Sequence, residues 1–278
     1  MKRKEGMRLE FWGARGTAPV SGRDKVVFGG NTPCASVRSA AGDLLIIDAG
    51  TGIRDLGEAL LREAGEEGFR VHLLLTHFHL DHIIGLPFFR PLFSAKAAIT
   101  FYSTGPREEA EKRLAGLMEG RYFPANFEET DARKEFVQVP DAPFTIGTVR
   151  VSYCRLIHPQ GSVAYKLEEG GRSLVFATDT ENPGDSLDEQ LAAFAAGATC
   201  LVYDATFSPE EYLAGKRGWG HSTWLEGTRL AAAAGVRSLI LSHWNPGHSD
   251  RQIKGMIGLA KSKFPRTIGA RQGLKKNI

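Results

Sequence analysis

Four potential metal ligands stand within six residues in the stretch His77-Phe78-His79-Leu80-Asp81-His82. Imidazole and carboxylate groups are the ligands that zinc and similar first-row metals take in proteins. A single histidine is more often an ordinary surface or core residue, but this density of ligand types indicates a metal site. The apolar run Val71 to Leu75 predicts a buried strand, so the ligands follow soon after its end.

Further strands and helices are predicted on both sides of this stretch. The strands cover residues 8–18, 34–49, 135–139, 148–157, 162–168, 173–178, 199–204 and 237–242, and the helices cover 53–67, 106–118, 187–196 and 223–234, with one more beginning near 83–87. Mostly buried strands with helices between them indicate a sheet-on-sheet core covered by helices. Since no repeat or linker divides the chain, we expect one domain over residues 1–278, with a helical and aromatic insert at about 106–135.

The composition is typical of a globular protein, with 42% hydrophobic and 24% charged residues in a chain of 278. No apolar run reaches the roughly 18 residues that a membrane-spanning helix needs, so no membrane partner is expected. The chain starts with MKRKEGMRLEFWG, which lacks the apolar segment of a secretory signal, and a cytoplasmic location is therefore expected. The three cysteines form no CxxC pair, which argues against a disulfide framework.

Positive charge is concentrated at the C-terminal end of the sequence. Residues 251–278 contain eight of the 35 Lys and Arg residues and no acidic residue. Such a segment attracts phosphates or nucleic acid, which makes nucleic acid an alternative partner. A solvated helix face followed by a frayed tail is the other interpretation.

The pattern HxHxDH of residues 77–82 resembles the signature of the metallo-β-lactamase superfamily. The resemblance extends over nearly the whole chain, from Phe11-Trp12-Gly13 to His248-Ser249-Asp250. It implies an α+β fold, an αββα sandwich in which two mixed sheets are flanked by helices. It also implies a hydrolase whose metal ions lie at one edge of the sandwich, between the sheets.

By the same resemblance, the remaining ligands are expected at the ends of later predicted strands. One ion would lie on His77, His79 and His158, and the other on Asp81, His82 and His243, with Asp179 between both. Two divalent ions are implied, zinc first, with manganese or iron as alternatives. Two adjacent cations lower the pKa of a shared water, so a bridging hydroxide is the expected nucleophile and Asp81 counts among the catalytic residues. Asp48 resembles a residue that orients ligand-bearing loops, with a plain turn residue as the alternative.

Two further motifs resemble those of the phosphodiesterase branch that includes the transfer-RNA 3′-processing enzymes. His221-Ser222-Thr223 matches its His-Ser-Thr motif, whereas its His-Glu-Ala-Thr motif here reads Tyr203-Asp204-Ala205-Thr206. A cationic His221 oriented by Asp204 is therefore the expected general acid, which protonates the alkoxide that leaves a phosphodiester. The alternative is a loop histidine ahead of a helix that Ser222 or Thr223 caps.

The expected substrate is a small phosphodiester or a nucleotide. The chain lacks the glycine-rich and basic arm of the transfer-RNA enzymes, and residues 11–16, 29–32 and 218–223 look like a bacterial subgroup that resembles class II cyclic-nucleotide phosphodiesterases. Arg15 and Ser222 are the predicted substrate contacts, because a guanidinium suits phosphate oxygens, although Arg15 also suits a structural carboxylate. A homodimer is compatible with the sequence.

Two other functions are consistent with the same residues. The first is a carbonyl hydrolase of this fold, acting on a lactone, a thioester or a β-lactam, in which nothing requires the His221 and Asp204 pair. The second is a metal-dependent sensor or nucleic-acid-binding module that uses the basic segment 251–278.

Overall fold

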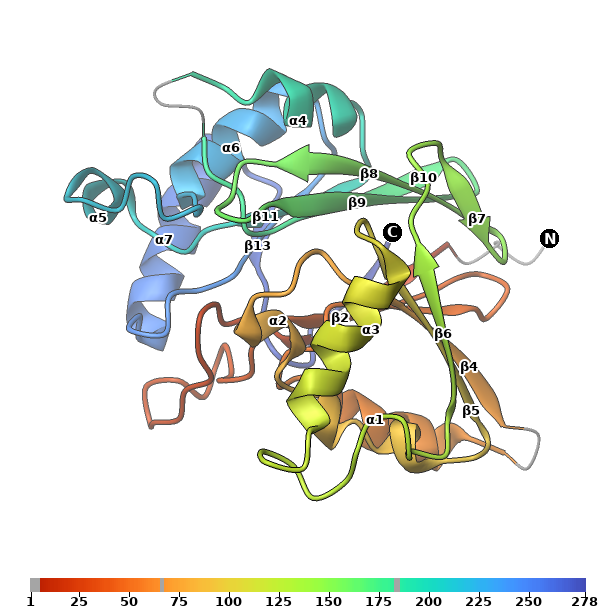
Figure 1. The fold of residues 1–278 in the computed structure, drawn as a ribbon. Coiled ribbons are helices and arrows are strands. Elements are labelled where there is room, and N and C mark those ends of the chain that lie inside the picture. The colour runs from red at the N-terminus through yellow and green to blue at the C-terminus, as the bar shows by residue number, and fades with distance from the viewer. Residues whose placement is uncertain (1–5, 66–67, 183–185) are drawn as a thin grey trace.

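The computed structural model describes residues 6–65, 68–182 and 186–278, and its strands form two sheets that face each other (Figure 1). The first sheet has the order β14 (Lys275–Asn277), β1 (Arg8–Gly13), β2 (Cys34–Arg38), β3 (Leu44–Ile47), β4 (Phe69–Leu74), β5 (Ala97–Ser103) and β6 (Arg133–Gln138). The second has the order β13 (Thr267–Gly269), β12 (Leu239–Ser242), β11 (Cys200–Asp204), β10 (Arg172–Ala177), β9 (Ser162–Glu169), β8 (Val149–Leu156) and β7 (Phe144–Ile146).

Each sheet is mixed in the same way. Strands β3, β4, β5 and β6 run parallel in the first sheet, and β10, β11, β12 and β13 run parallel in the second. The other neighbours in each sheet are antiparallel. Because parallel strands end at the same edge of a sheet, the loops that follow β3, β4, β10 and β12 gather at one edge of the sandwich.

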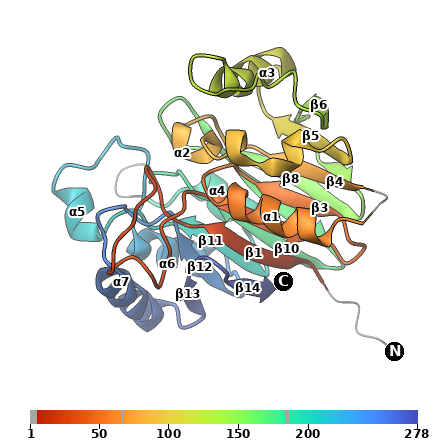
Figure 2. The same cartoon turned by 90° about the horizontal axis from the view of Figure 1, so that it is seen from below.

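Helices cover the outer faces of the two sheets, which gives the expected αββα sandwich. Figure 2 shows α1 on the outer face of the first sheet, and α4, α6 and α7 pack against strands of the second. The helices are α1 (Ile53–Glu63), α2 (Leu80–Ile83), α3 (Arg107–Ala115), α4 (Glu189–Phe194), α5 (Pro209–Leu213), α6 (Trp224–Ala233) and α7 (Asp250–Lys263), with 3-10 turns at Leu86–Phe88, Arg90–Phe93 and Gly116–Met118. No helix in these described ranges is long and apolar enough to cross a membrane.

Alternating side chains of the central strands fill two hydrophobic clusters. In β3, Leu45 and Ile47 point towards the second sheet, whereas Leu44 and Ile46 pack with residues of α1 such as Leu56. In a strand that is buried on both faces, every side chain needs to be apolar. This explains why Leu44 to Ile47 contains no polar residue. The larger cluster contains residues of both sheets and of helices α4, α6 and α7.

Several predicted boundaries were wrong. The strand expected at 34–49 is two strands, because the chain turns at Gly42 with φ of 101°. The strand expected at 8–18 ends at Gly13, where a bulge follows Phe11. The helix expected at 53–67 ends at Glu63, and residues 66–67 lie outside the described part of the chain. The helix expected near 83–87 begins earlier, at Leu80.

Strands β5, β7, β13 and β14 were not predicted. β14 corrects the interpretation of the C-terminal residues as a frayed tail, because Lys275 to Asn277 pair with β1 and form the edge of the first sheet. Lys275 Nζ also lies 3.3 Å from Glu10 Oε1. A strand of three mostly polar residues shows no hydrophobic pattern, so its pairing is set by the partner strand alone.

Candidate metal centre

The seven predicted ligands converge at the edge where the strand ends meet. Their atoms form three overlapping groups, each within 4.8 Å: His77, His79 and His158; His77, His82 and Asp179; and Asp81, His82 and His243. The stretch 77–82 follows β4, and the other three ligands follow β8, β10 and β12. The two predicted ion sites are therefore both represented by side chains that already face one another.

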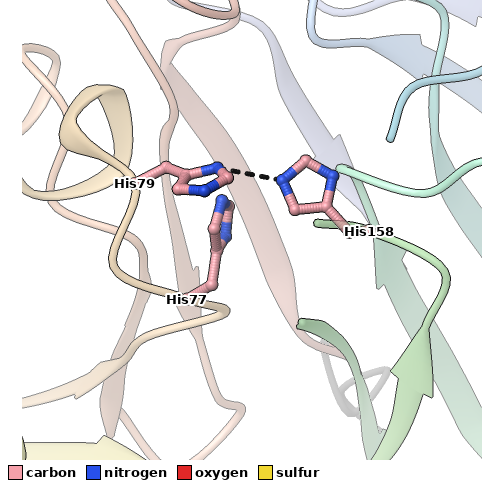
Figure 3. Close-up of side chains that lie close together, drawn as sticks. All are labelled: His77, His79 and His158. Atoms are coloured by element: carbon pink, nitrogen blue, oxygen red, sulfur yellow. Dashed lines mark hydrogen bonds between the residues drawn. The ribbon is translucent and has the colours of Figure 1, made fainter. Parts of the chain in front are cut away.

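The first group consists of three imidazoles (Figure 3). His79 Nδ1 lies 2.9 Å from His158 Nε2, and the ring of His77 lies edge-on to both. His79 begins the short helix α2 as its N-terminal cap residue, so its ring turns away from the helix and towards His158. The arrangement brings together one nitrogen from each ring, which is the ligand set expected for the first ion.

The second group joins a carboxylate to two imidazoles. Asp81 Oδ2 lies 3.5 Å from His82 Nε2 and 3.4 Å from His243 Nε2. The backbone N–H of Thr17 donates to the same oxygen over 2.7 Å, so the carboxylate orientation is held from the loop that follows β1. Asp81, His82 and His243 thus present three ligand atoms to one point.

Asp179 lies between the two groups. Its Oδ1 is 3.3 Å from His243 Nε2 and 4.0 Å from His77 Nε2, and its Oδ2 is 3.2 Å from His82 Nε2. Burial opposes the charged form, but the facing imidazoles of His243 and His82 hold the pKa of Asp179 well below its ordinary value. The carboxylate is therefore ionised and lies between the two predicted ion sites.

The second nitrogen of each ligand histidine is held by a partner outside the cluster. These contacts are His82 Nδ1 to Asp48 Oδ2 (2.8 Å), His77 Nδ1 to Thr76 Oγ1 (3.0 Å), His243 Nδ1 to Thr206 Oγ1 (2.9 Å), His158 Nδ1 to the Gly220 carbonyl (2.7 Å) and His79 Nε2 to Gln160 Oε1 (2.8 Å). Such partners fix the orientation of a metal-binding ring. Sequence analysis identified only Asp48 among them.

The inward-facing atoms fit a set of divalent cations. Among the described residues, the buried Nε2 atoms of His77, His82 and His243 and Oδ2 of Asp179 have no hydrogen-bond partner. Unpaired buried polar atoms are rare because each costs free energy, so several pointing at one place indicate a charged ligand. A mixed set of imidazoles and carboxylates is the chemistry that zinc, manganese and iron accept.

His221 and Asp204 are in contact beside this cluster. His221 Nδ1 lies 3.0 Å from Asp204 Oδ2, and its ring stacks on that of His243 at 4.9 Å between centroids. Burial opposes the cation, but the Asp204 carboxylate outweighs it and raises the pKa of His221 to about 9. Asp204 also accepts the backbone N–H of Asp179 over 2.9 Å, so one carboxylate supports both the predicted acid and the central ligand.

The structure contradicts the two predicted substrate contacts. Arg15 is fully buried, and its guanidinium donates to the carbonyls of Gly29, Asn245 and His248, with Asp250 at 3.8 Å. Ser222 is also buried, and its Oγ lies 3.0 Å from the Tyr203 hydroxyl. Both side chains are buried and bond to neighbouring parts of the chain. Thr223 caps helix α6, as the alternative interpretation expected.

Backbone conformation also marks this site. Five non-glycine residues in the described part of the chain have φ between 60° and 64°, a region that side chains rarely adopt. Every one of them belongs to the cluster or bonds to it: Asp179, His243, Asp48 beside His82, Gln160 beside His79, and Thr17 beside Asp81. Such torsions persist only where the surroundings hold them, and they gather at functional sites.

Glu181 is a supporting residue that sequence analysis missed. Its buried carboxylate accepts the Tyr212 hydroxyl (2.6 Å) and the backbone N–H groups of Gly218 (2.7 Å) and Gly220 (2.8 Å). Gly220 in turn orients His158 and directly precedes His221. No sequence signal indicates this role, because the partners are backbone groups of a distant loop.

Known proteins with similar sequences and structures agree with this fold. Residues 44–244 match the family described as the beta-lactamase superfamily domain. Ribonuclease Z of Bradyrhizobium sp. (strain ORS 278) is 29% identical over 280 residues, covering 82% of this chain and 88% of that protein. The metallo-beta-lactamase fold protein YhfI from Bacillus subtilis has a TM-score of 0.72 at 21% identity, over 99% of this chain and 100% of that one. Zn²⁺-bound PqqB from Methylobacterium extorquens has a TM-score of 0.72 at 17% identity, and the match covers 98% of this chain and 100% of PqqB.

Proposed function

Because this chain belongs to the beta-lactamase superfamily, we propose that it is a metal-dependent hydrolase that cleaves phosphodiesters with two divalent cations. The single observation that carries the choice of bond is the contact of His221 with Asp204, 3.0 Å apart, beside the ligand cluster. A relative named ribonuclease Z, 29% identical, supports the same choice.

In this proposal, His77, His79 and His158 hold one cation, Asp81, His82 and His243 hold the other, and Asp179 touches both. The pair of cations, when bound, lowers the pKa of a water molecule towards neutrality, which supplies a nucleophile, and neutralises charge on the phosphoryl oxygens. Asp48 and Thr206 keep the imidazoles of His82 and His243 turned towards the centre.

His221 is the residue that we assign to the leaving group. Its Nδ1 faces Asp204, so Nε2 is the atom left to donate a proton to the departing alkoxide. Its side chain is 13% exposed, whereas the Asp204 carboxylate behind it is fully buried. A proton donor of this kind matters for alkoxides and is dispensable for good leaving groups such as p-nitrophenolate.

Zinc is the cation that we propose first, because the ligands are mainly imidazoles and the similar PqqB structure is described as Zn²⁺-bound. We keep manganese and iron as alternatives. The three cysteines are free and buried, which fits the proposed cytoplasmic location. Cleavage of nucleic acid with help from residues 251–278, and a homodimer, remain predictions.

Parallel turnover assays test the function. The purified protein, loaded in turn with Zn²⁺ and Mn²⁺, is given bis-p-nitrophenyl phosphate, a lactone and a β-lactam. We expect hydrolysis of the phosphodiester and its loss on treatment with a chelator. Hydrolysis of a carbonyl substrate without hydrolysis of the diester would refute the proposal.

A further inference from the structure

A cavity of about 360 Å³ opens beside the ligand cluster, between helix α3 and the loop that joins β8 to β9. His77 and His79 line one side of it, and Gln160, which bonds to His79, lines another. Because two predicted ligands form part of its wall, a substrate bound at the metal centre extends directly into this space. Its volume is at the lower end of the range for small-molecule sites and suits one nucleotide.

One wall of the cavity is flat and cationic. The guanidinium carbon of Arg113, on α3, lies 4.9 Å from the centre of the Phe78 ring. All nucleobases can stack on aromatic rings and on guanidinium planes, because each has a flat π-face. Arg113 also pairs with Glu109 one turn earlier on the same helix, so its charge is partly balanced and its plane is held in place.

A second wall of the cavity, formed by β8 and β9, offers another cation. Arg155, near the end of β8, lines the cavity with an exposed side chain and interacts with the hydroxyl of Tyr153 on the same strand. Ser162, at the start of β9, also lines the cavity, but it pairs with Leu156, so its hydroxyl lies on the other face of the β8–β9 hairpin from Arg155. The guanidinium fork of Arg155 suits the oxygens of a phosphate group.

The predicted acid is not part of the cavity wall. His221 is not among the residues that line it, whereas His77 and His79 are. The part of the substrate that enters it is therefore not the alkoxide that His221 protonates. It is the part that keeps the phosphoryl group after cleavage.

We propose that this cavity binds one nucleotide on the retained side of the scissile phosphodiester, with its base against the Arg113 guanidinium that covers Phe78 and a further phosphate on Arg155. The inference rests on the proposed function for its scissile bond, but nucleotide binding can be measured without turnover. The preferred substrate is then a diester that carries a second, terminal phosphate.

Binding is tested by calorimetric titration with thymidine 3′,5′-bisphosphate and with thymidine 5′-phosphate. We expect the bisphosphate to bind about tenfold more tightly, because a charge-assisted hydrogen bond to Arg155 is gained. Arg155→Gln should remove this difference. The matched control is Arg150→Gln, which changes an exposed arginine of the same strand that pairs with Glu168 and does not line the cavity. Equal binding of both nucleotides by the unchanged protein would overturn the proposal.

Turnover gives an independent readout with a constant p-nitrophenolate leaving group. The substrates are thymidine 5′-(p-nitrophenyl phosphate), with and without a 3′-phosphate, and the ratio of their kcat/KM values is compared among variants. Arg155→Gln should lower the ratio about tenfold, Arg113→Gln should raise KM for both, and Arg150→Gln should change neither. A ratio unaffected by Arg155→Gln would overturn the cavity assignment even if the protein cleaves bis-p-nitrophenyl phosphate. Conversely, selective bisphosphate binding without any cleavage would support the cavity and refute the proposed function.

Discussion

The two sheets supply the metal centre in different ways. The first sheet contributes His77, His79, Asp81 and His82 from one loop after β4, whereas the second contributes His158, Asp179 and His243 from three loops that follow three strands. The first set shares one short segment and keeps its spacing by local geometry. The second keeps its spacing only through the register of β8, β10 and β12. A site built in this way depends on both sheets being in place.

The supporting carboxylates repeat this difference. Asp48, after β3, receives His82 Nδ1, the Thr76 backbone N–H and the Thr76 hydroxyl, which all belong to the same ligand loop. Asp204, at the end of β11, receives His221 together with the backbone N–H groups of Asp179 and Ser222. Asp48 thus serves one metal-binding loop, and Asp204 links a ligand to the predicted acid.

Removing the residue that joins the two sets should have the largest effect. We expect Asp179→Ala to lower kcat/KM for bis-p-nitrophenyl phosphate by about a thousandfold or more, because both ions lose a ligand. Metal content by mass spectrometry should fall in parallel. The control is Asp188→Ala, which removes the buried cap of α4 and should change thermal stability while metal content stays the same. Retention of both ions by Asp179→Ala would show that the ligands from each sheet bind an ion without this shared residue.

Removing the predicted acid should have the next largest effect, and only on some substrates. We expect His221→Ala to slow cleavage of diesters with alkoxide leaving groups by about 10²–10⁴-fold and to slow p-nitrophenyl diesters much less. Metal content should be unchanged. His248→Ala is the matched control, since His248 is buried and bonds to Glu211 away from the ligands. An equal loss on both kinds of substrate would contradict the acid role.

Replacing the two supporting carboxylates, Asp48 and Asp204, should change different properties. One change should affect metal binding and the other the pH dependence of catalysis. Asp48→Asn should weaken metal binding by about 10–100-fold, because His82 loses its partner. Asp204→Asn should instead act on the pH profile. His221 has a pKa raised to about 9 beside this carboxylate, so the protonated acid persists up to that pH in the unchanged protein.

Loss of the negative charge at Asp204 lowers the pKa of His221, since less holds the cation. The alkaline limb of kcat against pH should therefore move to lower pH in Asp204→Asn for alkoxide diesters. It should stay in place in Asp48→Asn. Identical profiles for Asp204→Asn and the unchanged protein would remove Asp204 from the acid function.

The smallest kinetic effect is expected at Arg15, which joins the loop at Gly29 to the loop at Asn245 and His248 and contacts none of the predicted ligands. Its guanidinium is buried on three carbonyls near Asp250. Arg15→Met should lower the free energy of unfolding by about 3 kcal/mol, since Asp250 and those carbonyls lose a buried charged donor. KM should be unchanged, as measured beside the exposed control Arg54→Met. A higher KM with normal stability would restore the predicted substrate contact.

The ligands of residues 77–82 could be predicted from residue types alone. The ligands from the second sheet could not. Residues 77–82 show their chemistry within one segment, so the sequence was sufficient there. His158, Asp179 and His243 were expected only by family resemblance, because lone residues at strand ends have no local signal. Arg15 and Ser222 were wrong for a related reason, since a motif gives a residue type but not whether its side chain faces a cleft or the interior.

The residues with φ near 60° have a consequence for how the site is assembled. Torsions of this kind cost roughly 1–3 kcal/mol each, and the folded chain adopts them at Asp48, Asp179, His243, Gln160 and Thr17. Contacts with the surrounding loops hold these torsions, so their cost is part of the folded state and lowers the free energy of unfolding. The fold is correspondingly less stable than its core allows. Thermal stability and the geometry of the candidate metal site are thus opposed in this protein. Gln160→Gly would raise stability by relieving a strained torsion, but His79 would lose its hydrogen-bond partner.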